Sequence, residues 1–288
     1  MNDNPDQKSK KKISIAEAIE ELSISPPTIY NQLKKAMSDP EVTFDQYAKI
    51  ISGDTTLMAR LLKIVNSPFY GLSAQVETIS HAITIVGVEQ LSELALVTGL
   101  SDKFEGIPSD LVNMNSFWVH SLSCGMGAQA IARKIKESNS ERYYVCGMLH
   151  DIGKLLIFRK WPDMARDALA QHYSTGHSLL KSESELLGFN HQDVGRAILK
   201  AWKLPESLVE GVGFHHTPQK AQNNKLMTSI IHVADILSYE MRIGDSGEPN
   251  APDLDPKALK LIGVDEETFL SIRGDLENQV EQAQSHFL

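Results

Sequence analysis

The chain has 288 residues, of which 42% are apolar and 23% are charged. This apolar share is enough to build a packed core, which excludes a chain that is disordered throughout. No apolar run approaches the roughly 18 residues that cross a bilayer, and two cysteines do not make a disulfide framework. The composition therefore predicts a soluble, reduced, cytoplasmic protein that does not span a membrane.

The formal net charge of −9 is concentrated toward the C-terminal end. From Asp245 onward there are ten acidic and three basic residues, so the rest of the chain is close to neutral. The sequence has no basic face for a phosphate backbone, which disfavours direct binding to nucleic acid. The exception is a short polar segment, residues 1–12, whose four lysines are predicted to belong to a disordered, solvated arm.

Apolar residues recur along the chain with the three- and four-residue spacing of helices. Leu57, Leu61 and Val65 show this spacing in the first half, and Ile230 and Leu237 show it near residue 230. The sustained alternation that is typical of strands is missing. Polar residues that favour helix starts precede several stretches, namely Thr43, Asp45, Asn190 and Asp193. The pattern predicts an all-α fold.

Glycine and proline residues divide this helical pattern into parts. A break at residues 106–109 ends an N-terminal helical lobe, predicted at residues 13–108. A second helical lobe, predicted at residues 109–243, contains most of the ten histidines. A linker rich in glycine, proline and aspartate then leads to an acidic C-terminal helix, and the two together fill residues 244–288.

The strongest local signal for chemistry is the adjacent pair His150 and Asp151. Apolar residues flank the pair on both sides, from Tyr144 to Leu149 and from Leu155 to Ile157, so both side chains are expected to be buried. A buried imidazole and carboxylate are costly unless they are paired or bind a metal ion. A carboxylate also offers two oxygens, which can bridge two cations.

Further candidate ligands lie on helix faces that also carry apolar residues. Together with the pair they make five histidines and two aspartates, more than packing alone requires. The alternative interpretation is a set of core histidines that are hydrogen-bonded and bind nothing. The additional candidates are His120, His191, His215, His216 and Asp235.

Two parts of this pattern resemble known families. The order His120, His150-Asp151 and Asp235 is similar to the H…HD…D signature of the HD superfamily of metal-dependent phosphohydrolases. Lys154 and three further histidines resemble the di-metal set of the HD-GYP cyclic-di-GMP phosphodiesterases; the histidines are His191, His215 and His216. The upstream half resembles the HDOD family, the HD-related output domain of bacterial signalling proteins. The segments that carry the HDOD resemblance, which covers roughly residues 15–240, are Leu61 to Ser67, Phe69-Tyr70-Gly71, Ile79 to Ile83 and Val86-Gly87.

The resemblance implies a two-lobed helical HDOD fold with an HD-type helical core in the C-terminal lobe. It also implies one or two divalent first-row metal ions, iron or manganese in first place, with zinc, nickel or magnesium as alternatives. Asp151 would bridge two ions and Lys154 would hold a phosphate oxygen, which makes these two the catalytic candidates. The implied metal ligands are His120, His150, Asp151, His191, His215, His216 and Asp235.

Two departures from the HD-GYP pattern leave catalysis open. Ser116 stands where that type has a glutamate, and Thr217 to Lys220 replace its Gly-Tyr-Pro loop. Members of the HDOD family are regarded as regulatory, so the first hypothesis is a regulatory protein that acts through a signalling protein partner or a ligand. The second hypothesis is an active metal-dependent phosphohydrolase on a nucleotide or a cyclic dinucleotide.

Other polar residues are interpreted as structural. Cys124 and Cys146 are predicted to be small buried packing residues, with a redox-sensitive position beside the ligands as the alternative. Asn66-Ser67-Pro68 is predicted to be a turn that caps the preceding helix, with part of a recognition surface as the alternative. Histidines in polar surroundings are predicted at the surface, and those near apolar stretches in the core or at its boundary. The first group is His172, His177 and His286, and the second is His81 and His232.

Overall fold

The structure of the chain, a computed structural model, describes residues 14–22, 25–67, 70, 72, 74–100, 103–104, 106–248 and 250–287. The arm predicted at residues 1–12 lies outside these residues, as do Phe69 and Gly71 of the upstream motif and the side chain of His286. None of the helices among the described residues combines the length and the apolarity that crossing a membrane requires.

Polar side chains begin the helices at the positions that the sequence pattern predicts. Thr43 and Asn190 each form a capping box with the residue three positions on, Gln46 and Asp193 respectively. In this arrangement each of the two side chains satisfies a backbone N–H that the helix start leaves free. Every regular element in the described part of the chain is a helix, which confirms the predicted all-α fold.

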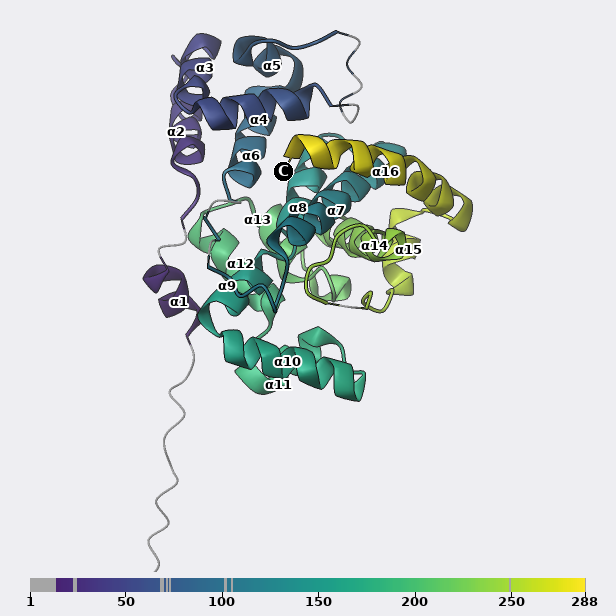
Figure 1. Ribbon diagram of the computed structural model, residues 1–288. Helices are drawn as coiled ribbons and strands as arrows, with labels where there is room; N and C mark the ends of the chain where they lie inside the picture. Colours follow the sequence, from purple (N-terminus) through teal and green to yellow (C-terminus); the bar gives the residue numbers. More distant parts are fainter. Residues whose placement is uncertain are drawn as a thin grey trace, which may run out of the picture.

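Helices α2 to α6 form a group at one side of the molecule (Figure 1). Their inward faces are apolar, and Leu33, Ile51 and Leu61 are fully buried between them. The preceding helix α1 (Ile15–Glu21) instead packs against α9 and α12 of the other lobe. The group consists of α2 (Thr28–Met37), α3 (Phe44–Ser52), α4 (Thr55–Val65), α5 (Ile79–Val86) and α6 (Val88–Thr98).

The Asn66-Ser67 segment is a structural turn at the end of α4. The Asn66 side-chain amide donates to the carbonyls of Leu62 (2.9 Å) and Val76 (2.7 Å), and its oxygen accepts the Val76 N–H (2.7 Å). The buried Ser67 hydroxyl donates to the Ile64 carbonyl at 2.7 Å. These bonds confirm the predicted cap, and they also fix the chain that returns toward α5.

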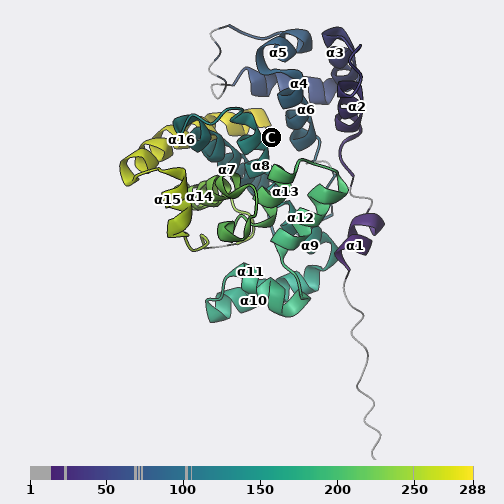
Figure 2. The ribbon, with the colours of Figure 1, turned by 180° about the vertical axis from the view of Figure 1, so that it is seen from behind.

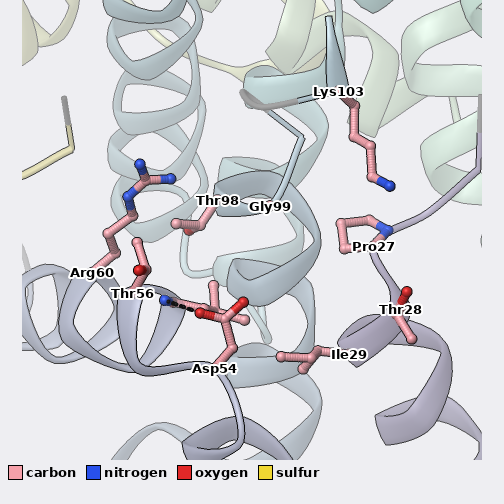
Figure 3. A pocket seen from close by; sticks show the side chains of 10 residues that line it. Pro27, Thr28, Ile29, Asp54, Thr56, Arg60, Thr98, Gly99 and Lys103 are labelled. Atoms are coloured by element: carbon pink, nitrogen blue, oxygen red, sulfur yellow. Dashed lines mark hydrogen bonds between the residues drawn. The ribbon is translucent and has the colours of Figure 1, made fainter.

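A cavity of about 250 Å³ lies where the starts of α2 and α4 meet the end of α6 (Figure 3). Its polar lining includes the side chains of Thr28, Asp54, Arg60 and Lys103. The Asp54 carboxylate is already used, because it accepts the Leu57 N–H at 2.9 Å and so caps α4. Asp54 therefore serves a helix start at the edge of this cavity.

The second lobe is built around α7, the long helix that packs against α8, α14 and α16. Helix α12 packs against α9 and α13, and the α10–α11 hairpin extends from the lobe at the end opposite α2–α6 (Figure 2). Its helices are α7 (Met114–Lys134), α8 (Glu141–Leu149), α9 (Ile152–Lys160), α10 (Pro162–Thr175), α11 (Leu179–Leu187), α12 (His191–Ala201), α13 (Glu206–Gly213) and α14 (Lys225–Met241), with a short 3₁₀ turn η2 (Pro218–Lys220).

The C-terminal helices connect the two groups. After α15 (Pro256–Ile262), which packs on α14, the last helix α16 (Glu266–Phe287) lies against both α7 and α4 (Figure 1). The side chains of Leu276 and Val280 on α16 are buried in these contacts. The acidic helix predicted near the C-terminus is therefore amphipathic, with an apolar face on the core and its acids toward solvent.

Two close helix contacts depend on glycine. A Cβ on Gly147 of α8 would come within 2.7 Å of the Gly125 Cα of α7, so only glycine allows this crossing. A Cβ on Gly153 of α9 would overlap the His191 carbonyl oxygen of α12 and approach the Gly195 nitrogen to 2.7 Å. These contacts hold the turn between α8 and α9 against both α7 and α12, and this turn carries the His-Asp pair.

Candidate metal centre

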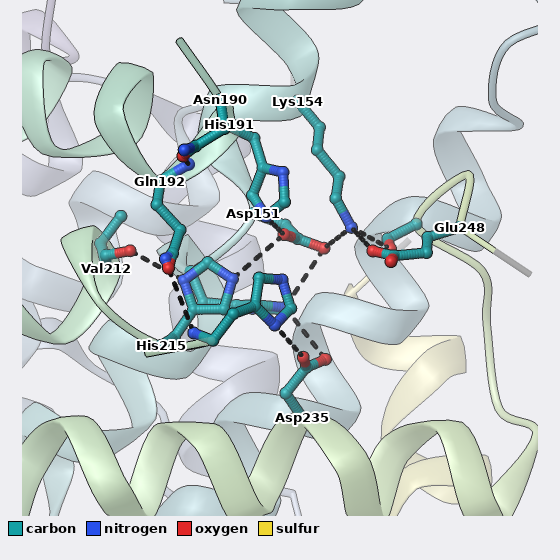
Figure 4. A network of polar contacts seen from close by, with 12 residues as sticks. Asp151, Lys154, Asn190, His191, Gln192, Val212, His215, Asp235 and Glu248 are labelled. Atoms are coloured by element: carbon teal, nitrogen blue, oxygen red, sulfur yellow. Dashed lines mark hydrogen bonds and ion pairs between the residues drawn. The ribbon is translucent and has the colours of Figure 1, made fainter. Parts of the chain in front are cut away.

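The turn between α8 and α9 carries His150 and Asp151. Figure 4 shows Asp151 among Lys154, His191 and His215. His150 is 0% exposed and Asp151 is 1% exposed. Lys154, on the first turn of α9, is also fully buried. The buried environment that the flanking apolar residues predict is therefore present, and three groups that prefer water lie inside it.

The first half of the centre joins this turn to α7 and α14. His120 Nε2 lies 3.1 Å from Asp235 Oδ1, and His150 Nε2 lies 3.3 Å from the same oxygen. The ligand atoms of His120, His150 and Asp235 lie within 4.8 Å of one another. Three segments that are far apart in the sequence thus bring two imidazoles and a carboxylate to one point.

The second half joins Asp151 to α12 and to the residues after α13. His191 Nε2 lies 3.8 Å and His215 Nε2 lies 3.6 Å from Asp151 Oδ1. His216 completes this group of ligand atoms, which again lie within 4.8 Å of one another. The other Asp151 oxygen, Oδ2, is 3.3 Å from His150 Nε2 of the first half. Asp151 therefore offers one oxygen to each half.

Three of the histidines are oriented by hydrogen bonds on the side away from the centre. His150 Nδ1 lies 2.6 Å from the Gly147 carbonyl, and His215 Nδ1 lies 2.7 Å from the Val212 carbonyl. His191 Nδ1 lies 2.6 Å from Glu183 Oε2. With the Nδ1 proton donated outward, each Nε2 lone pair faces the centre, which is the tautomer that a metal ligand needs.

Several of the inward-facing atoms have no hydrogen-bond partner. An unpartnered buried polar atom costs about 1–3 kcal/mol, so a cluster of them needs a compensating ligand. A set of imidazole nitrogens and carboxylate oxygens suits a divalent first-row metal ion. The atoms without a partner are His150 Nε2, Asp151 Oδ1, His191 Nε2, His215 Nε2 and both ring nitrogens of His216.

The electrostatics of the centre hold its carboxylates ionised and His215 neutral, whereas the acidic groups around His150 and His191 outweigh burial and raise the pKa of both imidazoles. Burial raises the pKa of Asp151, but the Lys154 ammonium and His150 outweigh it and hold this pKa well below its usual value. The pKa of Asp235 is lowered in the same way by His150 and His120. Burial lowers the pKa of His215 to about 4, so this imidazole is neutral near pH 7. Metal binding requires ionised carboxylates and neutral imidazoles.

Lys154 has all its hydrogen-bond donors occupied within the chain. Its Nζ donates to Asp151 Oδ2 at 2.8 Å, to Ser246 Oγ at 3.0 Å and to Glu248 Oε2 at 3.0 Å. An ammonium has three N–H donors, so none is left for a phosphate oxygen in this arrangement. The Tyr239 hydroxyl lies 3.0 Å from Ser246 Oγ and extends the same network.

All eight residues that the sequence predicts for the site lie in this one cluster. The sequence reasoning missed Glu183, which orients His191, and Ser246 and Glu248, which hold Lys154. Glu183 is 1% exposed and Glu248 is 4% exposed. A buried position for Glu183 is recognisable only once α11 is packed on α12, and Ser246 and Glu248 fall in a stretch that reads as a linker.

The predictions for the other histidines have mixed outcomes. His232 is a buried structural residue, because Nδ1 lies 2.8 Å from the His215 carbonyl and Nε2 accepts the Asp255 N–H at 2.9 Å. The surface prediction for His172 is wrong: the α10–α11 turn covers it, and Nδ1 lies 2.5 Å from the His177 carbonyl. His177 is partly exposed, and the prediction of His81 in the core or at its boundary is wrong, because its side chain is exposed. Cys124 and Cys146 are fully buried packing residues.

Comparisons with known proteins agree with this arrangement. A family model of the HDOD domain matches residues 24–218. An HDOD domain protein of unknown function from Geobacter sulfurreducens is 23% identical, with a TM-score of 0.73 over 95% of this chain and 96% of that protein. A protein of Shewanella amazonensis SB2B, whose description proposes a phosphohydrolase, is 21% identical, with a TM-score of 0.75 over 96% and 99%. These two structural likenesses concern the fold alone.

An uncharacterized protein of Treponema pallidum (strain Nichols) is 25% identical over 235 residues, or 80% of this chain. The chain spans 44% of the length of that curated relative. The HDOD match covers well over half of the chain and includes the upstream motif as well as most of the centre's ligands. The chain therefore belongs to the HDOD family.

Proposed function

We propose that this HDOD protein holds one or two divalent first-row metal ions, iron or manganese in first place, and acts as a regulatory signalling protein. The observation that carries the proposal is the set of buried atoms without partners on His150, Asp151, His191, His215 and His216. Such a set is unfavourable without a cation. It also lies on separate helices, so an ion there links them.

The regulatory role is supported by how closed the centre is. The ligand side chains of the centre are at most 7% exposed. Lys154 carries the only ammonium beside these ligands in the described chain. Its charge is balanced by ion pairs with Asp151 and Glu248. A centre of this kind stabilises one arrangement of α7, α9, α12 and α14, and a change at the centre is transmitted to the surfaces of these helices. We therefore propose a protein partner that recognises and binds this arrangement of the helices.

The first test measures the metal content of the full chain purified without a metal-affinity tag. We expect about one or two equivalents of iron or manganese by plasma mass spectrometry, and loss of this metal in Asp151→Ala, because Asp151 faces both halves. Asp163→Ala is the matched control, since that carboxylate is 95% exposed on α10. A wild-type protein that stays free of metal after anaerobic reconstitution contradicts the proposal.

A metal-dependent phosphohydrolase on a nucleotide or a cyclic dinucleotide is the second candidate. The observation that favours it is the bridging position of Asp151, with one oxygen toward each half of the centre. Two cations at such a site supply Lewis-acid activation of water and substrate. In that role Asp151 and Asp235 would hold the cations, and the Nδ1 bonds of His150 and His215 would keep their rings oriented.

The two candidates differ in a measurable way. The phosphohydrolase predicts release of phosphate or opening of a cyclic dinucleotide by the metal-loaded chain, and loss of this activity in His150→Ala. The regulatory protein predicts no turnover of a broad nucleotide panel while the metal is demonstrably bound. Activity that His150→Ala abolishes would establish the second candidate in place of the first.

A further inference from the structure

The segment that follows α14 covers one side of the centre. Residues 243–248, here called the strap, cross the first turn of α7, where the Asp245 N–H donates to the Ser116 carbonyl at 3.1 Å. Gly244 lies so close to the His120 backbone that a Cβ there would overlap it, and its φ of +76° also requires glycine. The strap is thus fitted closely to the helix that carries His120.

Alternate residues of the strap face in opposite directions. Ser246 and Glu248 are buried and accept hydrogen bonds from Lys154. Asp245 and Gly247 instead line a cavity of about 450 Å³, whose opposite wall includes Arg166 and Tyr173 of α10. The strap therefore separates the buried Lys154 ammonium from an open cavity. On its outer side the strap faces this cavity and not a packed helix.

The Glu248 carboxylate occupies a position suited to an external anion. Figure 4 shows it beside Lys154, on the side opposite the imidazoles of His191 and His215. Lys154 in turn contacts Asp151, which faces both halves of the centre. Carboxylate and phosphate oxygens are both charged acceptors for an ammonium, so each can take this place. Because Lys154 has no free donor, a ligand phosphate can bind it only by displacing Glu248 or Ser246.

We propose that Glu248 is an internal stand-in for the phosphoryl group of a small phosphate-bearing ligand, and that the strap is the gate through which this ligand reaches the centre from the 450 Å³ cavity. Displacement of Glu248 releases the strap from Lys154. The surface beside α7 and α10 therefore changes when the ligand binds. This inference rests on the proposed metal centre, and it adds the ligand class and the path.

The test uses inorganic phosphate as the probe and the full, metal-loaded chain as the protein. Titration calorimetry compares the wild type with Glu248→Gln, which removes the competing charge and keeps the shape. We expect phosphate affinity to rise at least about tenfold in Glu248→Gln. Glu240→Gln is the matched control, because Glu240 lies on α14 with a side chain that is 43% exposed, and its affinity stays at the wild-type value.

A second variant opens the strap without changing the charge at Lys154. Gly247 has a φ of +87°, and a Cβ there would lie 3.0 Å from the Leu111 carbonyl oxygen. Gly247→Ala therefore strains the strap from its outer side, and we expect it also to tighten phosphate binding. In the wild type, added phosphate is expected to accelerate amide hydrogen exchange in residues 243–248.

Two results overturn the inference. One is equal phosphate affinity in the wild type, Glu248→Gln and Gly247→Ala. The other is no phosphate binding to any of the three. Metal content is measured on the same samples, so a chain that holds its metal and ignores phosphate refutes the strap inference alone. A chain without metal refutes the proposed function first, and the two failures are thereby distinguished.

Discussion

The N-terminal helices α2–α6 and the lobe of α7–α14 bury different kinds of side chain. Among described residues 25–100, the buried polar residues are Ser67, Ser92 and Thr98. The second lobe buries the ligands of the centre together with Lys154, Glu183 and Glu248. The first group is an apolar core with polar groups at its surface, and the second is an apolar shell around charges.

This difference indicates that apolar packing stabilises the fold, and that the buried charges of the centre are present for another reason. Apolar burial contributes about 25 cal/mol per Å² and is the main interaction within α2–α6. Buried charges do not add stability by themselves, because desolvation offsets their mutual attraction. In the proposed function the second lobe keeps these charges for metal binding, and its glycine contacts and outer hydrogen bonds hold them in place. Variants in the two regions should fail in different ways.

The largest effect is expected at Gly153, where α9 meets α12. In Gly153→Ala the new Cβ overlaps the His191 carbonyl oxygen. Because this Cβ is fixed to the α9 backbone and the oxygen belongs to the α12 backbone, the two helices must separate. We expect the free energy of unfolding to fall by at least about 3 kcal/mol, measured by urea denaturation. His191 moves with α12, so metal is expected to be lost from the half that Asp151 forms with His191, His215 and His216.

Gly274→Ala on α16 is the control for that substitution. No atom lies within 4 Å of the position that its Cβ would take. Alanine costs less conformational entropy than glycine in a helix, so this variant should be more stable by up to about 1 kcal/mol, with unchanged metal content. A Gly153→Ala protein as stable as the wild type would show that α9 and α12 are not held by this contact.

The sequence was sufficient to predict the helices and the set of side chains that meet at the centre. Helical periodicity and the capping residues Thr43 and Asn190 are local signals, and the structure has helices at both places. His150 and Asp151 are adjacent, and their apolar flanks predict burial without any tertiary information. The assembly of ligands from four further segments came from the family resemblance, since spacing alone does not bring distant helices together.

The parts that the sequence did not predict depend on tertiary packing. Glu183 reads as one acid of an amphipathic helix, and only the contact of α11 with α12 turns it toward His191. Ser246 and Glu248 lie among glycines and a proline that suggest a solvated linker. His172 has polar neighbours in sequence, yet the turn after α10 folds back over it. In each case the environment comes from a contact that the local sequence pattern does not show.

Leu61→Ala tests the apolar side of the comparison. Leu61 is 0% exposed on α4, which packs against α5, α6 and α16. Removing the side chain leaves a cavity, and we expect a loss of about 2–5 kcal/mol in the free energy of unfolding. The metal content of the folded protein should stay at the wild-type value, because no ligand touches this helix.

The exposed Lys63 of the same helix provides the matched control. Lys63→Ala should change stability by no more than about 0.5 kcal/mol. Loss of metal from folded Leu61→Ala would break the comparison, since it would mean that the first lobe positions the centre as well as covering it. Both quantities are obtained from one preparation by denaturation and metal analysis.

Glu93 gives the smallest effect and lies at the seam between the two regions, on α6 facing Glu141 and Arg142 of α8 and Lys34 of α2. Glu93 is half-buried, and this partial burial and then the nearby Glu89 raise its pKa to about 7. The folded protein therefore holds a proton that the unfolded chain releases above about pH 4.5, and stability falls as the pH rises from there to about 7. Over this window the loss is roughly 2–3 kcal/mol.

Glu93→Gln should remove this pH dependence, because the amide stays neutral at every pH. The variant is expected to match the wild type at about pH 4.5 and to exceed its stability above about pH 7, as measured by urea denaturation across the range. Glu41→Gln, on an exposed carboxylate of the same lobe, should leave the wild-type slope unchanged. If Glu93→Gln retains that slope, the proton is held by another group. The seam, like the core of α2–α6, then holds no charge that makes stability depend on pH.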